Sequence, residues 1–270
     1  MPDLIYGRNP ILEALRAGQT IHEILVAAGS SPSRGALSEL LVLARRSHVP
    51  VRFVPREALD RAVAAAGEGA GAGAEGGPGL GVRAGPATHQ GVLAYVTEFA
   101  YTDLASILAI AIRRGEAPFL LVLDAVQDVH NLGSLIRTAE AAGVHGVLLP
   151  DRRAAGVTAA VRKASAGAIE HVAVARVALV EALDGLRLRG VRVVGLAMDG
   201  AEDYAGADLT GPLALVVGGE ARGLEAAVLR RCDVCVRLPM RGQVASLNAA
   251  VAGSIVLYEA LRQRDVPGGT

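Results

Sequence analysis

The feature that most restricts the fold of this chain is a regular alternation of apolar runs and helical patterns after residue 116. The apolar runs are rich in valine and leucine, which is typical of strands buried on both faces of a parallel sheet. Strands are predicted at FLLVLDA, HGVLLP, HVAVARV, VRVVGLAM, PLALVVG and VCVRLP. Helices are predicted at NLGSLIRTAEAAG, VTAAVRKASAG, VEALDGLRLRG, GLEAAVLRRC and SLNAAVAGSIVLYEALRQR. Ligands of such sheets bind beyond the carboxyl ends of the strands. Chemistry is therefore expected in the loops after Asp124, Pro150, Ala197, Val217 and Pro239.

Residues 1–97 predict a second, small α/β domain. Its strands are IHEILVA, VRFVP and HQGVLAYV, and its helices are Asn9 to Arg16, GALSELLVLARRSHV and PREALDRAVAAA. Asn9 stands where an N-cap belongs, with Pro10 at the first helical position. The Gly/Ala-rich residues 67–86 predict a flexible insertion. Residues 98–115 predict a linker with a helical stretch, and residues 116–270 form the parallel-sheet domain.

Composition excludes several classes of protein. The 270 residues carry 27 basic and 27 acidic side chains, so the chain as a whole does not attract nucleic acid by net charge. No apolar run reaches membrane-spanning length, and the N-terminus lacks a signal-peptide pattern, so we expect a cytoplasmic protein with no membrane partner. Cys232 and Cys235 have a metal or redox spacing. Because no second pair completes a zinc site, we predict buried thiols and no metal. His130, His145 and His171 also lack metal-ligand spacing.

The first polar loop is NLGSLIR. Asn131 and Gly133 begin a helix, and Arg137 follows Asn131 by six residues. Taken alone, a capping asparagine, a tightly packed glycine and a solvated arginine explain this loop.

The second loop is GGEARG, which follows a buried strand. Gly218 and Gly219 precede Glu220, and Gly223 precedes the next helix. The spacing fits neither the dinucleotide fingerprint nor the phosphate-binding P-loop, and the carboxylate would repel phosphate. The turn suits a close backbone approach to a neutral or cationic ligand better.

The third loop lies within LPMRGQVASLNAAVA. Pro239 fixes the loop entrance, and Gly242 supplies conformational freedom. Ser246 is predicted to cap the last helix. Asn248 has no such explanation.

The order of the three loops is specific where each alone is not. NxGxxxR, GGExxG and PMxGxxxSLNxxxA closely resemble the three motifs of the SpoU (TrmH) family of RNA ribose 2′-O-methyltransferases, within the SPOUT superfamily. YGRNPILEAL and HQGV look like the RNA substrate-binding domain of its RlmB-type members, which modify 23S ribosomal RNA. The resemblance covers nearly the whole chain, except for the Gly/Ala-rich run.

The resemblance implies a parallel-sheet methyltransferase domain with a C-terminal trefoil knot, a homodimer, and S-adenosylmethionine as the cofactor. The implied cofactor contacts are Leu196, Ala197, Gly218, Gly219, Leu238, Met240 and Leu247. The implied catalytic set is Asn131, Arg137, Glu220, Ser246 and Asn248. Arg8, Arg137 and Lys163 are the candidate RNA contacts; for Arg162 and Lys163 a solvated helix end is an equal explanation.

The implied reaction transfers a methyl group from a sulfonium to a ribose 2′-hydroxyl. That hydroxyl is a poor nucleophile near neutral pH, so its proton needs an acceptor or its developing charge needs a partner. A guanidinium is too basic to act as the base. We therefore expect Arg137 to position the adjacent phosphate and stabilise the oxyanion.

The expected substrate is a guanosine of 23S ribosomal RNA, in the large subunit or an assembly intermediate. A transfer RNA or another ribosomal site remains an alternative, because the three motifs serve them all. A non-catalytic RNA-binding assembly protein is a second alternative, and a nucleotide-dependent enzyme that uses GGEARG as a phosphate loop is a third.

Overall fold

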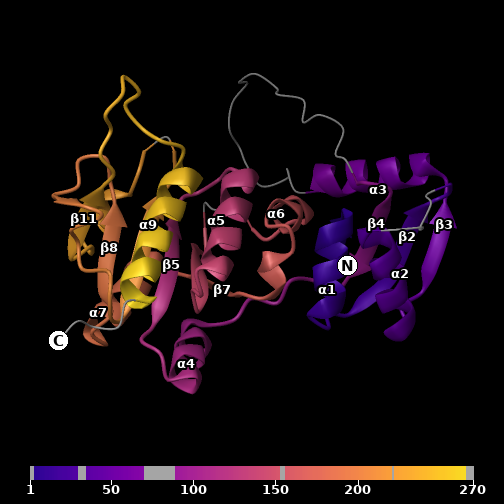
Figure 1. The fold of residues 1–270 in the computed structure, drawn as a ribbon, viewed down its shortest axis with the longest axis horizontal. Helices are drawn as coiled ribbons and strands as arrows, with labels where there is room; N and C mark the ends of the chain where they lie inside the picture. Colours follow the sequence, from indigo (N-terminus) through magenta and orange to yellow (C-terminus); the bar gives the residue numbers. More distant parts are fainter. Residues whose placement is uncertain (1–2, 30–34, 70–88, 153–155, 221, 266–270) are drawn as a thin grey trace. The chain divides into compact units, whose positions relative to one another are not determined.

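The computed structural model describes residues 3–29, 35–69, 89–152, 156–220 and 222–265 (Figure 1). The chain divides into two compact units, and a segment of the second half of the sequence belongs to the first unit. Unit 1 comprises Met1–Phe99 and Val157–Glu170, and unit 2 comprises Ala100–Gly156 and His171–Thr270. From residue 70 on, the predicted insertion lies outside the described residues, whereas residues 67–69 end a helix and are not a loop.

Unit 1 contains a mixed four-stranded sheet in the order β1-β4-β2-β3. The strands are β1 (Asp3–Tyr6), β2 (Ile21–Ala27), β3 (Val51–Val54) and β4 (Val92–Val96). β4 runs antiparallel to both β1 and β2, while β2 and β3 are parallel. The strand after the Gly/Ala-rich stretch thus completes the sheet of the N-terminal unit.

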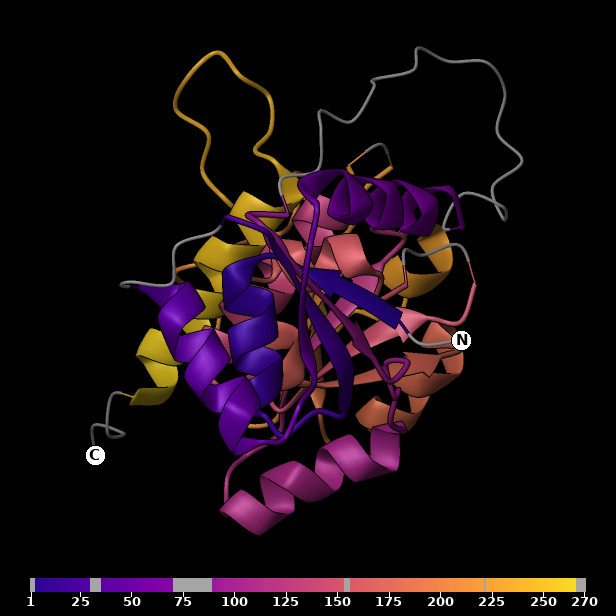
Figure 2. The same ribbon diagram turned by 90° about the vertical axis from the view of Figure 1, so that its right-hand side faces the viewer.

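Alternate side chains of this sheet face two different layers of helices. Val26 and Val92 face α1 (Arg8–Arg16) and α2 (Ala36–Arg46), while Leu25 and Leu93 face α3 (Arg56–Gly69) (Figure 2). The short helix α6 (Ala159–Ala164) and the 3-10 turn η1 (Ala168–Glu170) contact β1 and α1. The predicted helix VTAAVRKASAG is therefore shorter than expected and belongs to unit 1.

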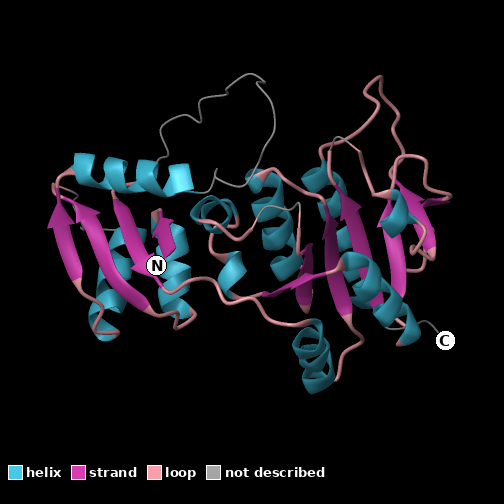
Figure 3. Cartoon of the chain, turned by 180° about the vertical axis from the view of Figure 1, so that it is seen from behind, coloured by secondary structure: helices cyan, strands magenta, loops and turns pink. Residues whose placement is uncertain are grey.

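Unit 2 contains a seven-stranded sheet in the order β7-β6-β5-β10-β8-β11-β9, and every pairing is parallel (Figure 3). The strands are β5 (Phe119–Asp124), β6 (Gly146–Pro150), β7 (Ala173–Val177), β8 (Arg192–Leu196), β9 (Glu202–Asp203), β10 (Leu213–Gly218) and β11 (Val234–Arg237). The predicted parallel sheet is confirmed. Its central strands, β5 and β10, are buried along their whole length.

Helices cover both faces of this sheet. On one face Ile107, Leu183 and Val228 bring α4 (Leu104–Arg114), α7 (Leu179–Leu188) and α8 (Ala226–Leu229) into one apolar core. On the other face α5 (Val129–Ala141) packs beside α9 (Ala249–Asp265), which also contacts β10. A Cβ on Gly253 of α9 would lie 2.7 Å from Leu135 Cδ2, so this glycine lets α9 and α5 approach closely. The C-terminal trefoil knot stays a prediction.

The capping asparagine considered for NLGSLIR is wrong, because α5 begins at Val129 and its N-cap is Asp128, not Asn131. Two further predicted helix caps are also wrong. α9 begins at Ala249, where Asn248 Oδ1 accepts hydrogen bonds from the backbone N–H groups of Ala250 (2.9 Å) and Val251 (3.2 Å), so Ser246 is not the cap. α1 is capped by Gly7, whose φ of 99° is open to glycine, and not by Asn9. In both cases the pattern of polar residues placed the cap near the correct helix end but on the wrong residue.

Candidate active site at the carboxyl ends of the strands

The register of the parallel strands gathers the candidate cofactor residues at one edge of the sheet. Leu196, the last residue of β8, lies opposite Val217 of β10 and Val236 of β11. Ala197 continues this ladder, because its N–H donates to the carbonyl of Val236 at 3.0 Å. Gly218 is the last residue of β10, and Leu238 directly follows β11. The structure therefore brings Leu196, Ala197, Gly218 and Leu238 to the same strand ends.

The glycine turn after β10 folds back on itself and leaves no room for a side chain at Gly218 or Gly219. The N–H of Gly223 donates to the carbonyl of Gly219 at 2.9 Å, and Gly223 has a φ of +63°. A Cβ on Gly218 would lie 2.2 Å from the carbonyl carbon of Gly223, and one on Gly219 would lie 2.5 Å from the carbonyl oxygen of Ala125. The turn consequently presents backbone to its surroundings, which suits a ligand held by peptide groups.

A buried carboxylate ties this turn to the neighbouring strand. Asp124, at the end of β5, is 3% exposed, and its Oδ2 accepts a hydrogen bond of 2.6 Å from the N–H of Glu225. Burial raises the pKa of Asp124, and the hydrogen bond from Glu225 opposes that shift. Asp124 thus fixes the glycine turn relative to β5.

Two asparagines from distant parts of the sequence meet beside this edge. Asn248 Nδ2 donates to Asn131 Oδ1 at 2.9 Å, while Asn248 Oδ1 caps α9. Asn131 is 8% exposed, and its backbone N–H donates to Asp128 Oδ1 at 2.8 Å. Both ends of the pair are therefore fixed by a helix start. The sequence analysis missed Asp128, although an aspartate three residues before Asn131 is an N-cap signal.

The other three candidate catalytic residues are not brought to this pair. Arg137, Glu220 and Ser246 are exposed, and none has a hydrogen bond to Asn131 or Asn248 in the described part of the chain. Arg137 lies six residues after Asn131 on α5, which corresponds to about 9 Å along the helix axis. The described single chain therefore contains the asparagine pair and the glycine turn, but not a closed constellation of all five residues.

An open groove of about 490 Å³ lies between α5 and α9 and includes the asparagine pair. Its residues include Asn131, Ser134, Asn248, Val251, Ile255 and Tyr258. The exposed fractions of Val251, Ile255 and Tyr258 are 49%, 36% and 52%. Their spacing of four and three residues puts them on one face of α9. The sequence analysis missed this apolar face, which the same spacing could have revealed.

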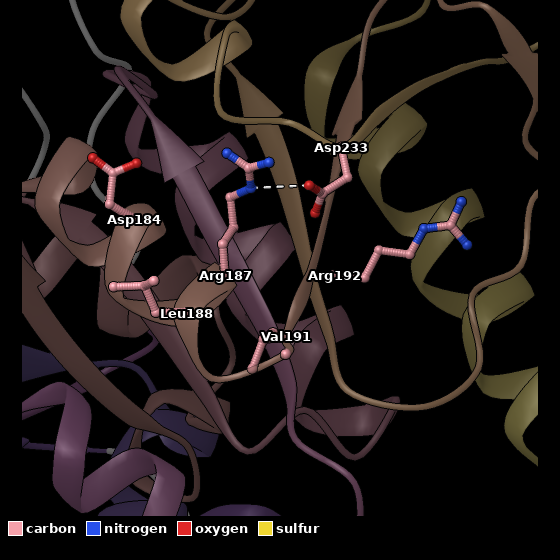
Figure 4. Close-up of a pocket in the computed structure, with 7 residues that line it drawn as sticks. Asp184, Arg187, Leu188, Val191, Arg192 and Asp233 are labelled. Carbon is pink, nitrogen blue, oxygen red and sulfur yellow. Dashed lines mark hydrogen bonds and ion pairs between the residues drawn. The ribbon is translucent and has the colours of Figure 1, made fainter.

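A second groove of about 580 Å³ lies at the opposite ends of the strands. It is lined by Asp184, Arg187, Leu188, Val191, Arg192 and Asp233 (Figure 4). Arg192 begins β8, and the guanidinium of Arg187 donates to Asp233 Oδ1 at 2.9 Å. Because its charged groups are already paired and it lies at the amino end of β8, this groove is not the candidate active site.

The candidate RNA contacts Arg8 and Lys163 both lie in unit 1, next to Tyr6. Lys163 Nζ is 4.8 Å from the centre of the Tyr6 ring, and Arg8 Nε donates to the carbonyl of Gln90 at 3.3 Å. Burial lowers the pKa of Lys163. Arg162 is 1% exposed, so the expectation that it contacts RNA or lies at a solvated helix end is wrong.

Cys232 and Cys235 are free and half-buried, so the thiols are less buried than predicted. Burial is the main cause that raises the pKa of Cys232 to about 12, with Cys235 as a further cause. The described residues contain no group of three or more potential metal ligands. No helix in the described ranges combines the length and apolar character needed to cross a bilayer.

Comparisons with known proteins agree with this geometry. The SpoU rRNA Methylase family model matches residues 118–258, and the RNA 2′-O ribose methyltransferase substrate-binding model matches residues 4–66. A protein named as the TrmH family tRNA/rRNA methyltransferase YacO of Bacillus subtilis is 37% identical, with 98% of each chain covered. The chain belongs to the SpoU/TrmH family of RNA methyltransferases.

Two solved structures are also similar. The SpoU methyltransferase AviRb of Streptomyces viridochromogenes, in complex with AdoMet, has a TM-score of 0.72 and 27% identity, with 96% of this chain and 89% of that chain covered. A second structure, which concerns the 2-OH methylation of C/U34 on tRNA, has a TM-score of 0.50 and 31% sequence identity to this chain. It covers 54% of this chain and 96% of that chain. The predictions of the family and of an N-terminal substrate-binding domain are confirmed.

Proposed function

We propose that this protein transfers a methyl group from S-adenosylmethionine to a ribose 2′-hydroxyl of RNA, and that the target is a guanosine of 23S ribosomal RNA. The observation that carries the proposal is the Asn131–Asn248 hydrogen bond beside the glycine turn at the strand ends. Two of the three family motifs thereby meet in one site, next to the third. We further propose that the protein acts in the cytoplasm.

The glycine turn fits S-adenosylmethionine better than a nucleotide phosphate. Gly218 and Gly219 leave only backbone at the turn, and the neighbouring Glu220 favours a cation over an anion. Leu196, Ala197, Leu238, Met240 and Leu247 would complete the contacts from the adjoining loops. When bound, the cofactor supplies an electrophilic methyl group on a sulfonium. We also propose that the C-terminal part of the chain, which ends with α9, forms a trefoil knot and that this knot favours binding of the cofactor.

The chain's own polar groups would prepare the hydroxyl. Asn131 and Asn248 would orient the ribose as an amide pair, because the Asn248 side chain caps α9 and holds the side chain of Asn131, whose backbone is fixed by Asp128. Arg137 would hold the adjacent phosphate and stabilise negative charge that develops on the 2′-oxygen. Glu220 and Ser246 would hold the flanking loops once RNA and cofactor are present.

We propose that the active form is a homodimer that packs through the groove of α5 and α9. Val251, Ile255 and Tyr258 present exposed apolar surface there, beside the asparagine pair. Apolar surface of this kind is stabilised by burial against a second chain. A second chain at this groove would also approach Asn131, Asn248 and the exposed Arg137.

Two observations support ribosomal RNA over transfer RNA as the target. The matching family model is named for rRNA, and the transfer-RNA methylation structure matches only 54% of this chain. The relatives carry the name tRNA/rRNA methyltransferase, so transfer RNA is the alternative target. A non-catalytic RNA-binding role is the second alternative.

The test is incubation with methyl-labelled cofactor and either an unmodified 23S transcript or unmodified transfer RNA, with primer extension to map the product. We expect label in the 23S transcript at one guanosine. Arg137→Ala should fold and bind cofactor but transfer no methyl, while Arg113→Ala on the exposed end of α4 should retain activity. Absence of label from every RNA, including assembly intermediates, would contradict the proposal, and label in transfer RNA alone would reassign the substrate.

A further inference from the structure

We propose that Arg162 is a positioning residue for RNA binding, because it anchors the segment Val157–Glu170 to unit 1 and so holds Lys163 over the Tyr6 ring. The inference rests on the proposed action on RNA. It assigns a role to a segment that the sequence pattern placed in the methyltransferase domain. The geometry that carries it lies entirely within unit 1.

Arg162 joins three parts of the chain from a buried position. Its Nη1 donates to Glu170 Oε1 at 2.8 Å, and its Nη2 lies 3.4 Å from Asp3 Oδ2. Its guanidinium carbon is 5.5 Å from the centre of the Phe99 ring. The side chain is 1% exposed, and a charge so buried is tolerated only with such partners.

Buried Val161 and Ile169 and the Thr158 cap also hold the segment, but the contacts of Arg162 are the ones that tie it to Asp3 and Phe99. Helix α6 has six residues, which is far below the length at which a helix is stable on its own. The chain then turns at Gly167, where φ is +94° and a Cβ would lie 2.5 Å from Glu13 Cβ. Arg162 is therefore the buried polar anchor of a short helix and a tight turn.

Lys163 follows the anchor directly and lies over the aromatic ring of Tyr6, the last residue of β1. Its Nζ is 4.8 Å from the centre of the Tyr6 ring, two residues before Arg8. Arg8 is held by Gln90. The backbone N–H of Arg8 donates to Gln90 Oε1 at 3.1 Å, and Arg8 Nε donates to the carbonyl of Gln90 at 3.3 Å. The two terminal nitrogens of Arg8 have no hydrogen-bond partner among the described residues.

Lys163 is thus held over Tyr6 at the end of β1, and Arg8 is held by Gln90 two residues further along the chain. A guanidinium fork and an ammonium group are the usual contacts to RNA phosphates. RNA phosphate is therefore the chemistry that this pair would recognise. Arg162 cannot touch RNA itself, because it is buried, and it acts by keeping Lys163 at this place.

The test measures filter binding of the full-length protein to an unmodified 23S transcript across a series of salt concentrations. Lys163→Gln should weaken binding several-fold and lower the slope of log K against log salt by about 0.7–0.9, the value for one phosphate contact. Arg162→Met should lower the slope to the same extent. The double variant should bind no more weakly than Arg162→Met, because the second change removes a contact already lost.

Methyl transfer gives an independent readout. Arg162→Met should raise KM for RNA and leave kcat unchanged at saturating RNA, whereas Arg162→Lys should restore part of the affinity. If Arg162→Met does not fold, Glu170→Gln replaces it in the comparison of single and double variants, because it removes one ion-pair partner of Arg162. Arg231→Met, which breaks an ion pair with Asp184 in unit 2, is the matched control and should leave the slope unchanged.

Two results would overturn the inference: a normal salt slope for folded Arg162→Met, or an effect of that change that persists in full in the Lys163→Gln background. A protein that binds RNA with the expected slopes but methylates none would contradict the proposed function and leave this inference standing.

Discussion

Removal of the Asn248 side chain should destabilise unit 2 by about 2–4 kcal/mol. Asn248→Ala deletes the cap of α9, which is worth about 1 kcal/mol. It also deletes the hydrogen bond to Asn131 Oδ1, and a buried acceptor left unpaired costs about 1–3 kcal/mol. Asn131 is 8% exposed, so water replaces that bond only in part.

Asn248→Asp separates the two effects. The carboxylate still accepts from Ala250 and Val251, and its charge at a helix N-terminus is favourable by about 0.3–1 kcal/mol. The variant keeps the cap but still leaves Asn131 Oδ1 unpaired, so we expect a loss of about 1–2 kcal/mol, smaller than that of Asn248→Ala by the value of the cap. Methyl transfer should fall in both variants, since each changes the amide presented to the ribose.

The assay is urea unfolding followed by circular dichroism, because the chain has no tryptophan. The midpoint shift multiplied by an unchanged m-value gives the free energy. Gln243→Ala, an exposed change in the same loop, is the control and should unfold like the parent. The reasoning is refuted if Asn248→Ala costs less than about 0.5 kcal/mol, or if Asn248→Asp costs as much as Asn248→Ala.

Three further predictions follow from the site. Gly218→Ala should abolish S-adenosylmethionine binding in calorimetry and lower the free energy of unfolding by about 1–3 kcal/mol or more, because its Cβ would overlap Gly223. Gly242→Ala is the control and should bind the cofactor normally, because a Cβ there meets open space. The pKa of Cys232 is raised to about 12, so the unfolded state releases this proton first, and the free energy of unfolding should fall as pH rises from about 9 to about 12. A Cys232→Ala variant should lose that part of the pH dependence; an identical profile would contradict the assignment. Tyr258→Glu should shift the protein from dimer to monomer in sedimentation, and an unchanged dimer would place the interface elsewhere.

The parallel sheet could be predicted because its information is local. The valine and leucine runs of β5 and β10 are continuous, and a strand buried on both faces requires that pattern. The loops could be ranked because ligands bind at carboxyl ends. The family motifs then named the residues of those loops.

The helix ends and side-chain partners could not be predicted in the same way. Ser246 and Asn248 are both good caps, and only the packing of α9 against α5 selects Asn248 by placing it beside Asn131. The burial of Arg162 was equally hidden, because its partners Asp3 and Phe99 are distant in sequence. Such contacts depend on tertiary structure and leave no periodic signal.

The return of Val157–Glu170 to unit 1 has a consequence for synthesis on the ribosome. Residues 1–99 leave the ribosome first, but the helix that completes their fold follows about sixty residues later, which takes roughly 3–12 s at bacterial elongation rates. During that interval Tyr6 and Phe99 lack their partners Lys163 and Arg162. Unit 1 can therefore complete its fold only after β5 and β6 of unit 2 have been synthesised.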